Sequence, residues 1–345
     1  MVTRYPAYDL SRRNTFGMKV SCRLYVEVTE PEDLLALDFD ALPQPVFVMG
    51  GGSNLLFTGD YQGTVMHLGN ASCHAERSEE SVLVTLGSGV VFDDFCAWAA
   101  AGGLWGPENL SLIPGEVGAS AVQNIGAYGV EAKDIIDTVH VFDLRERRFV
   151  DIPGADCGYG YRTSNFKTTW KGRYIITAVT FRLSLVPTPI LDYGGVRKAL
   201  ENRGPIPSPL TPQIIRETII GIREKKLPDP AKIGSAGSFF CNPVIEKDHF
   251  ARIVALAKAE NGPDYDVPHY EVGDKVKVPA AWMIDQCGFK GMRLGGAQVY
   301  PNQPLVIVNA TGDATPQDII ALERRVIDTI QDKYGITLHP EVEHV

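Results

Sequence analysis

The sequence contains no apolar run of about 18 residues, no low-complexity tract and no pair of cysteines at CxxC spacing. We therefore expect no membrane-spanning helix, and the polar segment 1–14 lacks the apolar core of a secretory signal. None of the seven histidines falls at a metal-binding spacing, so we predict no metal site. The cysteines are scattered, which indicates reduced thiols rather than a disulfide framework; they are Cys22, Cys73, Cys96, Cys157, Cys241 and Cys287.

Charge and composition limit the class of protein further. The formal net charge is −9 at pH 7, which argues against nucleic acid or an anionic membrane as the main partner. An acidic chain can still hold a local basic pocket for a phosphorylated ligand. Apolar residues make up 44% and charged residues 22% of the chain, as in ordinary soluble globular proteins. A length of 345 residues predicts two or three domains.

The stretch Ile113–Glu131 is the most informative part of the chain. It reads IPGEVGASAVQNIGAYGVE, with four glycines and only two charges, Glu116 and Glu131. This glycine density disfavours a regular helix or strand, yet the segment is too apolar for a mobile surface loop. Glycines let backbone N–H groups approach an anion, and a short side chain such as Ser120 can supplement them. Composition alone leaves open a tight loop beneath a core.

A second glycine cluster, Gly50 to Asn54, follows a short predicted strand at Val46–Met49. A strand that runs into three glycines, Ser and Asn resembles a phosphate-binding turn in outline. The cluster is not the GxGxxG of a Rossmann unit, and no βαβ alternation surrounds it. A tight exit from a strand has the same appearance and stays open as the alternative.

Hydrophobic periodicity predicts an α+β chain, with strands in the first 210 residues and helices in the last third. Strands are expected at Leu24–Val28, Val46–Met49, Val82–Val84, Val139–Leu144, Tyr174–Leu185, Val276–Val278, Leu305–Asn309 and Ile336–Leu338. Helices are expected at Phe92–Ala101, Lys247–Ala259 and Ala280–Cys287, from Thr211-Pro212 to Lys226, and from Thr315-Pro316 to Gly335.

Several ordered motifs, spread over nearly the whole chain, resemble those of one family. They are Asn14-Thr15-Phe16-Gly17, Gly50-Gly51-Gly52-Ser53-Asn54-Leu55-Leu56, Ile113 to Glu131, Cys157-Gly158-Tyr159-Gly160-Tyr161-Arg162, Lys226-Leu227-Pro228, Gly237 to Pro243, Ala281 to Cys287 and Pro340-Glu341-Val342. The chain is similar to UDP-N-acetylenolpyruvoylglucosamine reductase, the flavoenzyme called MurB. It departs from the usual family pattern at Gly51 and at Cys241, where lysine is common.

The resemblance implies the FAD-binding fold of the vanillyl-alcohol-oxidase type and noncovalent FAD. It divides the chain into FAD-binding subdomain 1 (1–68 and 332–345), FAD-binding subdomain 2 (69–213) and a substrate-binding domain (214–331). Both glycine loops are then expected to leave N–H groups free for the cofactor diphosphate. The cofactor-binding residues it implies are Gly50, Gly51, Gly52, Ser53, Asn54, Ile113, Pro114, Gly115, Val117, Gly118, Ser120, Gln123, Asn124, Gly126, Ala127, Tyr128 and Gly129.

The implied reaction is reduction of an enolpyruvyl ether by NADPH through FAD, with hydride going to C3 and a proton to C2. Arg162 is the implied partner of the substrate carboxylate, because a guanidinium offers a forked, permanent cation. Ser238 is the implied acid at C2, and Glu341 polarises the carboxylate or orients a water. Without the resemblance these residues would be interpreted as a surface ion pair, a turn serine and a solvated charge near the C-terminus.

The substrate-contacting positions implied by the resemblance are Tyr161, Tyr193, Lys226, Asn242, Tyr270 and Lys290. Lysines and tyrosines suit a diphosphate, since ammonium groups carry charge and phenols add directional hydrogen bonds. Tyr193 lies in an insert that, with the loop 264–270, indicates the longer subclass with a tyrosine-bearing lid. Tyr265 and Tyr270 both qualify as the second tyrosine of that lid.

Two other functions are compatible with parts of the sequence. An oxidase with the same cofactor domain has no reason to keep Arg162, Ser238 and Glu341 together, and no histidine attachment motif for covalent flavin is evident. A catalytically silent nucleotide-sugar sensor could lose Ser238 or Glu341, and both are present. The resemblance therefore favours a cytoplasmic enzyme of peptidoglycan precursor synthesis, monomeric, with small-molecule substrates and no nucleic-acid or membrane partner.

Overall fold

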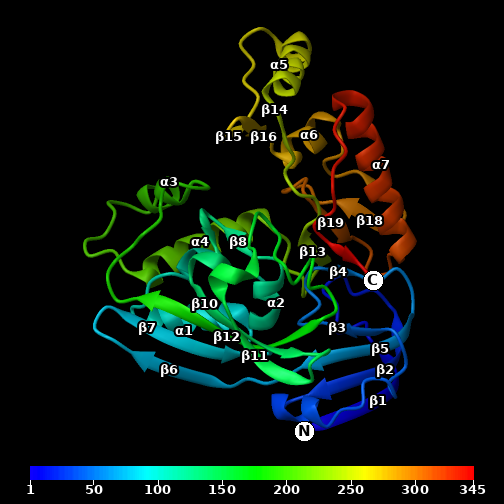
Figure 1. Cartoon of the computed structure of the whole chain (residues 1–345). Coiled ribbons are helices and arrows are strands. Elements are labelled where there is room, and N and C mark those ends of the chain that lie inside the picture. The colour runs from blue at the N-terminus through cyan, green and yellow to red at the C-terminus, as the bar shows by residue number, and fades with distance from the viewer. The chain divides into compact units, whose positions relative to one another are not determined.

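The computed structural model describes residues 1–345, which form two compact units (Figure 1). Unit 1 comprises Met1–Arg13, Val20–Ser53 and Asp60–Lys225, and unit 2 comprises Asn14–Lys19, Asn54–Gly59 and Lys226–Val345. The tail 332–345 therefore belongs to unit 2. The division into two FAD-binding subdomains and a substrate-binding domain stays a prediction. No helix has both the length and the apolar composition needed to cross a membrane.

The first sheet of unit 1 is four-stranded and mixed. Its order is β1 (Val2–Asp9), β2 (Ser21–Val28), β5 (Tyr61–Leu68) and β3 (Val46–Val48). β1 is antiparallel to β2, whereas β2, β5 and β3 run parallel. The 3₁₀ turn η1 (Pro31–Leu35) contributes Leu34 to the core beside this sheet. β1 was not predicted, because an edge strand with mostly exposed side chains has no alternating apolar pattern.

The second sheet of unit 1 is five-stranded and antiparallel. Its order is β11 (Arg148–Pro153), β10 (Ile136–Asp143), β12 (Tyr174–Ser184), β7 (Ser81–Gly87) and β6 (Cys73–Arg77). Helices α1 (Phe92–Ala101) and α2 (Val117–Val122) lie over one face (Figure 1). Phe95 of α1 stacks on Phe181 of β12 with ring centroids 4.7 Å apart. This apolar face holds α2, and with it the glycine-rich stretch, in a fixed place.

Short elements complete unit 1. They are η2 (Glu108–Leu110), the hairpin β8 (Gly126–Ala127) and β9 (Val130–Glu131), η3 (Ala132–Asp134), η4 (Gly154–Cys157), α3 (Val196–Glu201) and α4 (Pro212–Lys226). Helices α3 and α4 share a small apolar cluster with Trp105, to which Leu200 and Ile215 contribute. An ion pair between Arg216 and Asp93, 2.5 Å long, joins α4 to α1. The insert that carries Tyr193 thus packs on unit 1 by its own helices.

Unit 2 contains two antiparallel sheets with helices packed against them. One has the order β13 (Gly234–Ser238), β19 (Val306–Asn309), β18 (Ala297–Val299) and β17 (Arg293–Leu294). The other has the order β14 (Val244–Glu246), β16 (Lys275–Lys277) and β15 (Tyr270–Val272). The helices are α5 (Lys247–Asn261), α6 (Ala280–Gln286) and α7 (Pro316–Tyr334).

Helix α7 begins and ends where its sequence predicts. Thr315 and Asp318 form a reciprocal capping box, Pro316 occupies the first turn, and Gly335 ends the helix in the left-handed conformation. The strand predicted at Ile336–Leu338 is wrong. Ile336 and Leu338 are buried but pair with no strand, so their apolar character serves core packing rather than a ladder. The tail reaches a strand only at β20 (Glu343–His344), which pairs in parallel with β4 (Leu55–Leu56).

Candidate active site

The two glycine clusters meet in unit 1. The Ser53 hydroxyl donates to the carbonyl of Pro114 over 3.1 Å. A Cβ on Gly50 would lie 3.2 Å from the Cβ of Ala119, tighter than most real contacts, so a larger residue would push the two loops apart. Gly115 has φ +119°, and a Cβ there would lie 2.8 Å from the Ser53 hydroxyl. Glycine is thus required for the contact between the loops as well as for their conformation.

The loops differ in which backbone groups they leave available. The amides of Gly50, Gly51 and Ser53 have no hydrogen-bond partner in the chain. In the second loop, by contrast, the Val117 amide donates to Val90 and the Gly118 amide donates to Ser88, over 2.9 and 3.0 Å. The expectation that both loops leave their N–H groups free is therefore wrong for these two amides, because the turn into α2 uses them to pack on the segment before α1.

Two of the predicted cofactor-binding residues use their polar side-chain groups in hydrogen bonds within the protein. The Ser120 hydroxyl is buried and donates to the Val117 carbonyl over 2.6 Å. Asn124 is fully buried; its amide donates to Glu131 and to the Gly160 carbonyl, and its oxygen accepts from the Lys133 amide over 2.9 Å. These contacts hold the stretch in shape, and direct cofactor contact by either side chain stays a prediction.

Backbone strain is concentrated in the same region. Only six residues other than glycine have positive φ, and they include Asn124 (52°), Tyr128 (49°) and Arg162 (55°). Such conformations cost free energy and persist where the surrounding structure enforces them, often at functional sites. Arg162 donates from its guanidinium to the Gly126 carbonyl over 2.6 Å. The structure therefore places the predicted catalytic arginine directly against the predicted cofactor loop.

Asn109 ties the tyrosine-bearing insert to that loop. Its buried side-chain amide donates to the carbonyls of Tyr128 and Ile190, over 2.8 and 2.9 Å. A Cβ on Gly129 would lie 3.1 Å from the Cβ of Tyr193, so the insert and the loop are in van der Waals contact. The Tyr193 side chain itself is 42% exposed. This arrangement brings a predicted substrate residue next to the predicted cofactor residues 128 and 129.

In unit 2, a bulge in β13 orients Ser238. The pairing of β13 with β19 shifts register between Ser235 and Ser238, and Gly237 inside the shift has φ +74°. Bulges of this kind redirect a side chain and are common next to active sites. Ser238 is half-buried, and its hydroxyl makes no hydrogen bond within the chain. It lies at the end of a strand, so the turn-serine interpretation does not describe its surroundings.

The C-terminal tail brings Glu341 beside Ser238. The Glu341 amide donates to the carbonyl of Phe239 over 2.8 Å, and the Cys241 amide donates to that of His339 over 3.0 Å. The Asn54 side chain in turn donates to the Glu341 carbonyl over 3.1 Å. Glu341 is half-buried rather than a solvated terminal charge. The tail therefore packs within unit 2, against the segment that follows Ser238.

The other predicted substrate residues of unit 2 are mostly exposed. Lys226, the last residue of α4, is exposed, as is Lys290, which follows α6. Asn242 is half-buried, and its side-chain oxygen accepts from the Ala280 amide at the start of α6 over 2.9 Å. Tyr265 accepts a hydrogen bond from the Trp282 indole over 2.9 Å, whereas Tyr270 is 48% exposed on β15. This difference favours Tyr270 as the ligand-facing tyrosine.

Comparison with known proteins shows the family to which this chain belongs. Residues 229–345 match the family described as UDP-N-acetylenolpyruvoylglucosamine reductase, C-terminal domain, and residues 23–147 match a family of FAD-binding domains. The UDP-N-acetylenolpyruvoylglucosamine reductase of Bacteroides fragilis is 44% identical over 344 residues, covering 98% of this chain and 99% of the relative. That of Porphyromonas gingivalis is 43% identical over 343 residues, covering 98% of each. The chain belongs to this reductase family.

A solved structure of the reductase family has the same fold. The crystal structure of the MurB reductase from Thermus caldophilus aligns with 100% of this chain and 98% of its own, with a TM-score of 0.67 at 23% identity. The α+β fold with an FAD-binding domain is thereby confirmed. The FAD-binding match includes both glycine loops, and the reductase match includes Ser238 and Glu341.

The residues of unit 1 fit the FAD of this reductase family. A Cβ on Gly118 would lie 2.7 Å from the Cβ of Ser88, so the backbone is closely packed where the second loop enters α2. The three unpaired amides of Gly50, Gly51 and Ser53 lie on one turn, which is the donor set that binds phosphate groups without side-chain charge. Gly50 to Ser53 would hold the diphosphate, and the second loop would supply the surface beside it.

Arg223 lies close to two predicted site residues, Tyr128 and Arg162, and was not singled out from the sequence. Its position among the basic residues that end α4 indicates a solvated charge, but its Nε is buried without a hydrogen-bond partner. Burial lowers its pKa from the ordinary value, with the positive charge of Arg162 acting in the same direction, while Tyr128 and Asp93 oppose the shift. Burial also raises the pKa of Tyr128, which lies beside this guanidinium. A second cation thus lies near Arg162 on the cofactor-loop side of unit 1.

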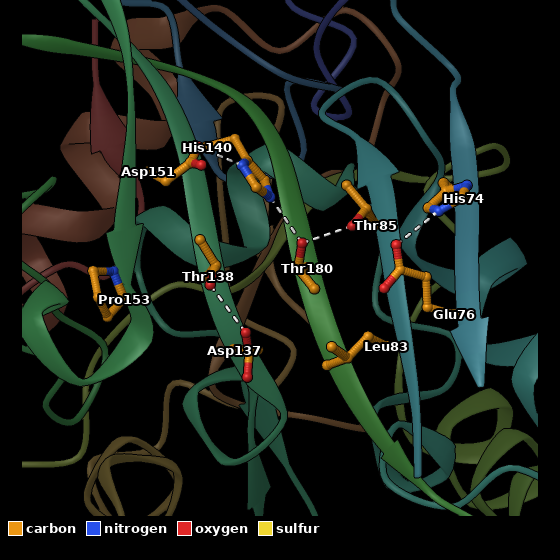
Figure 2. A pocket seen from close by; sticks show the side chains of 10 residues that line it. All are labelled: His74, Glu76, Leu83, Thr85, Asp137, Thr138, His140, Asp151, Pro153 and Thr180. Atoms are coloured by element: carbon orange, nitrogen blue, oxygen red, sulfur yellow. Dashed lines mark hydrogen bonds and ion pairs between the residues drawn. The ribbon is translucent and has the colours of Figure 1, made fainter. Parts of the chain in front are cut away.

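A hollow of about 330 Å³ on the five-stranded sheet is a different place (Figure 2). There the His140 ring bonds Asp151 over 2.7 Å and Thr180 over 2.8 Å, in the carboxylate–imidazole–hydroxyl order of a nucleophilic triad. Thr180 also bonds Thr85, and both lie within paired strands, whose backbone N–H groups are used by the ladder. The backbone N–H groups of Thr85 and Thr180 are therefore not available to an oxyanion, so these two residues do not supply the backbone donors of a hydrolytic site.

Proposed function

We propose that this protein reduces UDP-N-acetylglucosamine enolpyruvate to UDP-N-acetylmuramate with NADPH and FAD, a step of peptidoglycan precursor synthesis. The observation that carries the proposal is 44% identity to a reductase of this name over almost the full length of both chains. The placement of Ser238 beside Glu341, and of Arg162 on the cofactor loop, supports the same chemistry. All six cysteines are free thiols, which suits a reducing cytoplasm, and we propose that the protein acts there as a monomer.

FAD held at the Gly50–Ser53 turn would supply the hydride for the enolpyruvyl carbon C3, with NADPH as the source of its electrons. The chain's own residues then have to stabilise negative charge and deliver one proton. Arg162 binds the substrate carboxylate with a fork that keeps its charge at every working pH. Preorganised charge of this kind stabilises a developing enolate by several kcal/mol, roughly 2.7–4 for a single donor in comparable sites.

Ser238 gives its hydroxyl proton to C2 once the enolate has formed. A hydroxyl is a weak acid, but an enolate carbon is a much stronger base, so the transfer is favourable at that stage. Glu341, fixed beside Ser238 by the backbone pairing at Phe239, hydrogen-bonds the substrate carboxylate as an acid or orients a water. The residues proposed to contact the substrate are Tyr161, Tyr193, Lys226, Asn242, Tyr270 and Lys290.

Purified protein is expected to be yellow, with FAD released intact on denaturation. The unpaired amides of the Gly50–Ser53 turn motivate this expectation. The measurement is the absorption spectrum of the protein and of the acid-soluble supernatant. Colourless protein from a flavin-replete culture that binds no FAD on titration would contradict it.

Lys226→Ala and Tyr193→Phe are expected to weaken binding of the enolpyruvyl substrate by about ten- to a hundredfold, the value of one charge-assisted phosphate contact. The rate of flavin reduction by NADPH should stay close to wild type, although NADPH affinity can fall if it uses the same residues. Lys225→Ala is the matched control, because Lys225 is the preceding exposed lysine of the same helix. Equal substrate affinity in the Lys226 and Lys225 variants would refute the assignment.

An oxidase and a silent nucleotide-sugar sensor are separated from the reductase by one anaerobic experiment. NADPH should bleach the flavin absorbance, and the enolpyruvyl substrate should restore it without oxygen. An oxidase would recover its colour only when oxygen is admitted. A sensor would bind the substrate and leave the reduced flavin unchanged.

A further inference from the structure

A buried histidine joins the first sheet of unit 1 to the second glycine loop. Its Nδ1 lies 3.0 Å from Glu27 of β2, and its Nε2 lies 3.0 Å from the carboxylate of Glu116. This residue, His67 of β5, is 7% exposed, and both carboxylates are largely shielded from water. Three residues that lie far apart in the sequence thus form one chain of charged groups, here called the Glu–His–Glu chain.

The two ends of the Glu–His–Glu chain have different surroundings. Glu27 also accepts a hydrogen bond from the Tyr25 phenol over 2.8 Å and lies 3.7 Å from the Arg13 guanidinium. Glu116 lies beneath the first glycine turn: a Cβ on Gly50 would be 3.2 Å from its carboxylate, and one on Gly51 would be 3.5 Å away. The Glu116 end therefore touches the backbone that carries the unpaired amides, and the Glu27 end is anchored in the sheet.

The protonation state of the histidine decides whether the chain is attractive. A neutral imidazole has one N–H donor and one acceptor nitrogen, whereas an imidazolium donates from both. With carboxylates 3.0 Å from both nitrogens, only the imidazolium bonds both of them as carboxylates. Loss of the proton leaves a lone pair facing a carboxylate and an uncompensated buried negative charge, which is costly.

We propose that His67 is a positioning residue for FAD, which holds Glu116 and thereby the loop Ile113–Gly118 against the amides of the Gly50–Ser53 turn. The inference rests on the proposed function in that FAD is the ligand of those amides. His67 acts in two ways. It fixes the distance between the loops, and it compensates the Glu116 charge, which would otherwise oppose a diphosphate bound at the adjoining turn.

The pH dependence of this device follows from the same contacts. Burial lowers the pKa of His67, but the bonds to Glu116 and Glu27 outweigh it and raise the pKa to about 9 from an ordinary 6.5. A raised pKa means that the stabilisation is complete below pH 6.5, declines above that value and is lost as the pH rises through about 9. FAD affinity of the wild-type apoprotein should therefore fall on the alkaline side, with a midpoint near that value.

The experiment is titration of apoprotein with FAD, followed by quenching of flavin fluorescence, at pH values from about 6 to 10, chosen to bracket the shifted pKa. His67→Gln is expected to weaken FAD binding at neutral pH by roughly 10- to 100-fold, the value of one or two charge-assisted bonds, and to abolish the alkaline fall. His140→Gln is the matched control. It breaks a similar histidine–carboxylate bond to Asp151 on the sheet face and should leave both affinity and pH profile as in wild type.

A second variant keeps the inference testable if His67→Gln does not fold. Glu116→Gln retains the shape of the chain but removes one of the two carboxylates that raise the pKa, so the alkaline midpoint should move toward neutral pH. A wild-type profile with no alkaline fall, or a midpoint that Glu116→Gln leaves unchanged, overturns the positioning role. Failure of the wild-type apoprotein to bind FAD at any pH is a different result, because it overturns the proposed function itself.

Discussion

Ser238→Ala is expected to fold, to bind FAD and to be reduced by NADPH at the wild-type rate, yet to lose turnover almost completely. The substitution deletes a proton source but no charge. Hydride transfer to C3 is unproductive unless C2 is protonated, so the loss should exceed the roughly 10²–10⁴-fold effect typical of one general acid. The measurement is single-turnover reoxidation of pre-reduced flavin by the enolpyruvyl substrate under anaerobic conditions.

Two variants control this result. Ser238→Cys keeps an ionisable proton at the same place and should recover part of the loss, which a purely structural serine would not do. Ser235→Ala removes a hydroxyl from the other side of the same bulge, where Ser235 is buried, and should reoxidise normally. If the Ser238→Ala flavin reoxidises at a near-wild-type rate, Ser238 is not the acid.

Arg162→Lys should lower kcat by about 10²–10³-fold while leaving FAD content unchanged, the effect of losing one preorganised donor at a developing negative charge. The lysine keeps the positive charge but has no fork, so it cannot hold a carboxylate and the Gly126 carbonyl together as a guanidinium can. Arginine and lysine at position 162 have the same energetic cost for the positive φ. The change in rate therefore reports the geometry of the donor, and steady-state kinetics with saturating NADPH measures it.

Arg147→Lys provides the matched control for that variant. Arg147 also has a positive φ, 52°, and its guanidinium donates to the carbonyls of Leu35 and Leu37 over 3.0 and 2.8 Å. It should lose thermal stability without losing kcat. Equal effects on kcat in the two variants would show that Arg162 matters only for the structure of its loop.

The sequence predicts a helix or strand well where all the residues that begin and end it lie within the segment itself. Helix α7 has its capping box, its proline and its terminal glycine within the segment itself, so both ends could be placed. The strand predicted at Ile336–Leu338 failed because two buried apolar residues do not distinguish a ladder from core packing. Strand β1 was missed because its pairing with β2 uses backbone groups, which leave no pattern in its side chains.

The candidate site was predictable to the level of loops and less so to that of atoms. The family resemblance predicts that both glycine clusters bind one cofactor, and the structure brings Ser53 of one cluster against Pro114 of the other. No sequence feature indicates which backbone amides form hydrogen bonds within the fold. The internal hydrogen bonds of the Val117 and Gly118 amides could therefore not be predicted. Arg223 and His67 could not be singled out because their importance comes from partners distant in the sequence. A positive φ or a desolvated charge exists only in the folded chain.

The alternation of the two units along the chain has a consequence for biosynthesis. Unit 2 draws on residues 14–19 and 54–59, which are translated early, and on Lys226–Val345, which are translated after unit 1. Phe16 packs against Phe239, with ring centroids 6.3 Å apart, and can do so only after Phe239 has been synthesised. In the same way, Leu55–Leu56 can pair with Glu343 and His344 of β20 only after those residues have been synthesised. Most of unit 1 can fold on the ribosome in the meantime, since domains generally fold as they are made. The proposed acid, Ser238, therefore gains its final surroundings only after the ribosome has passed Glu341.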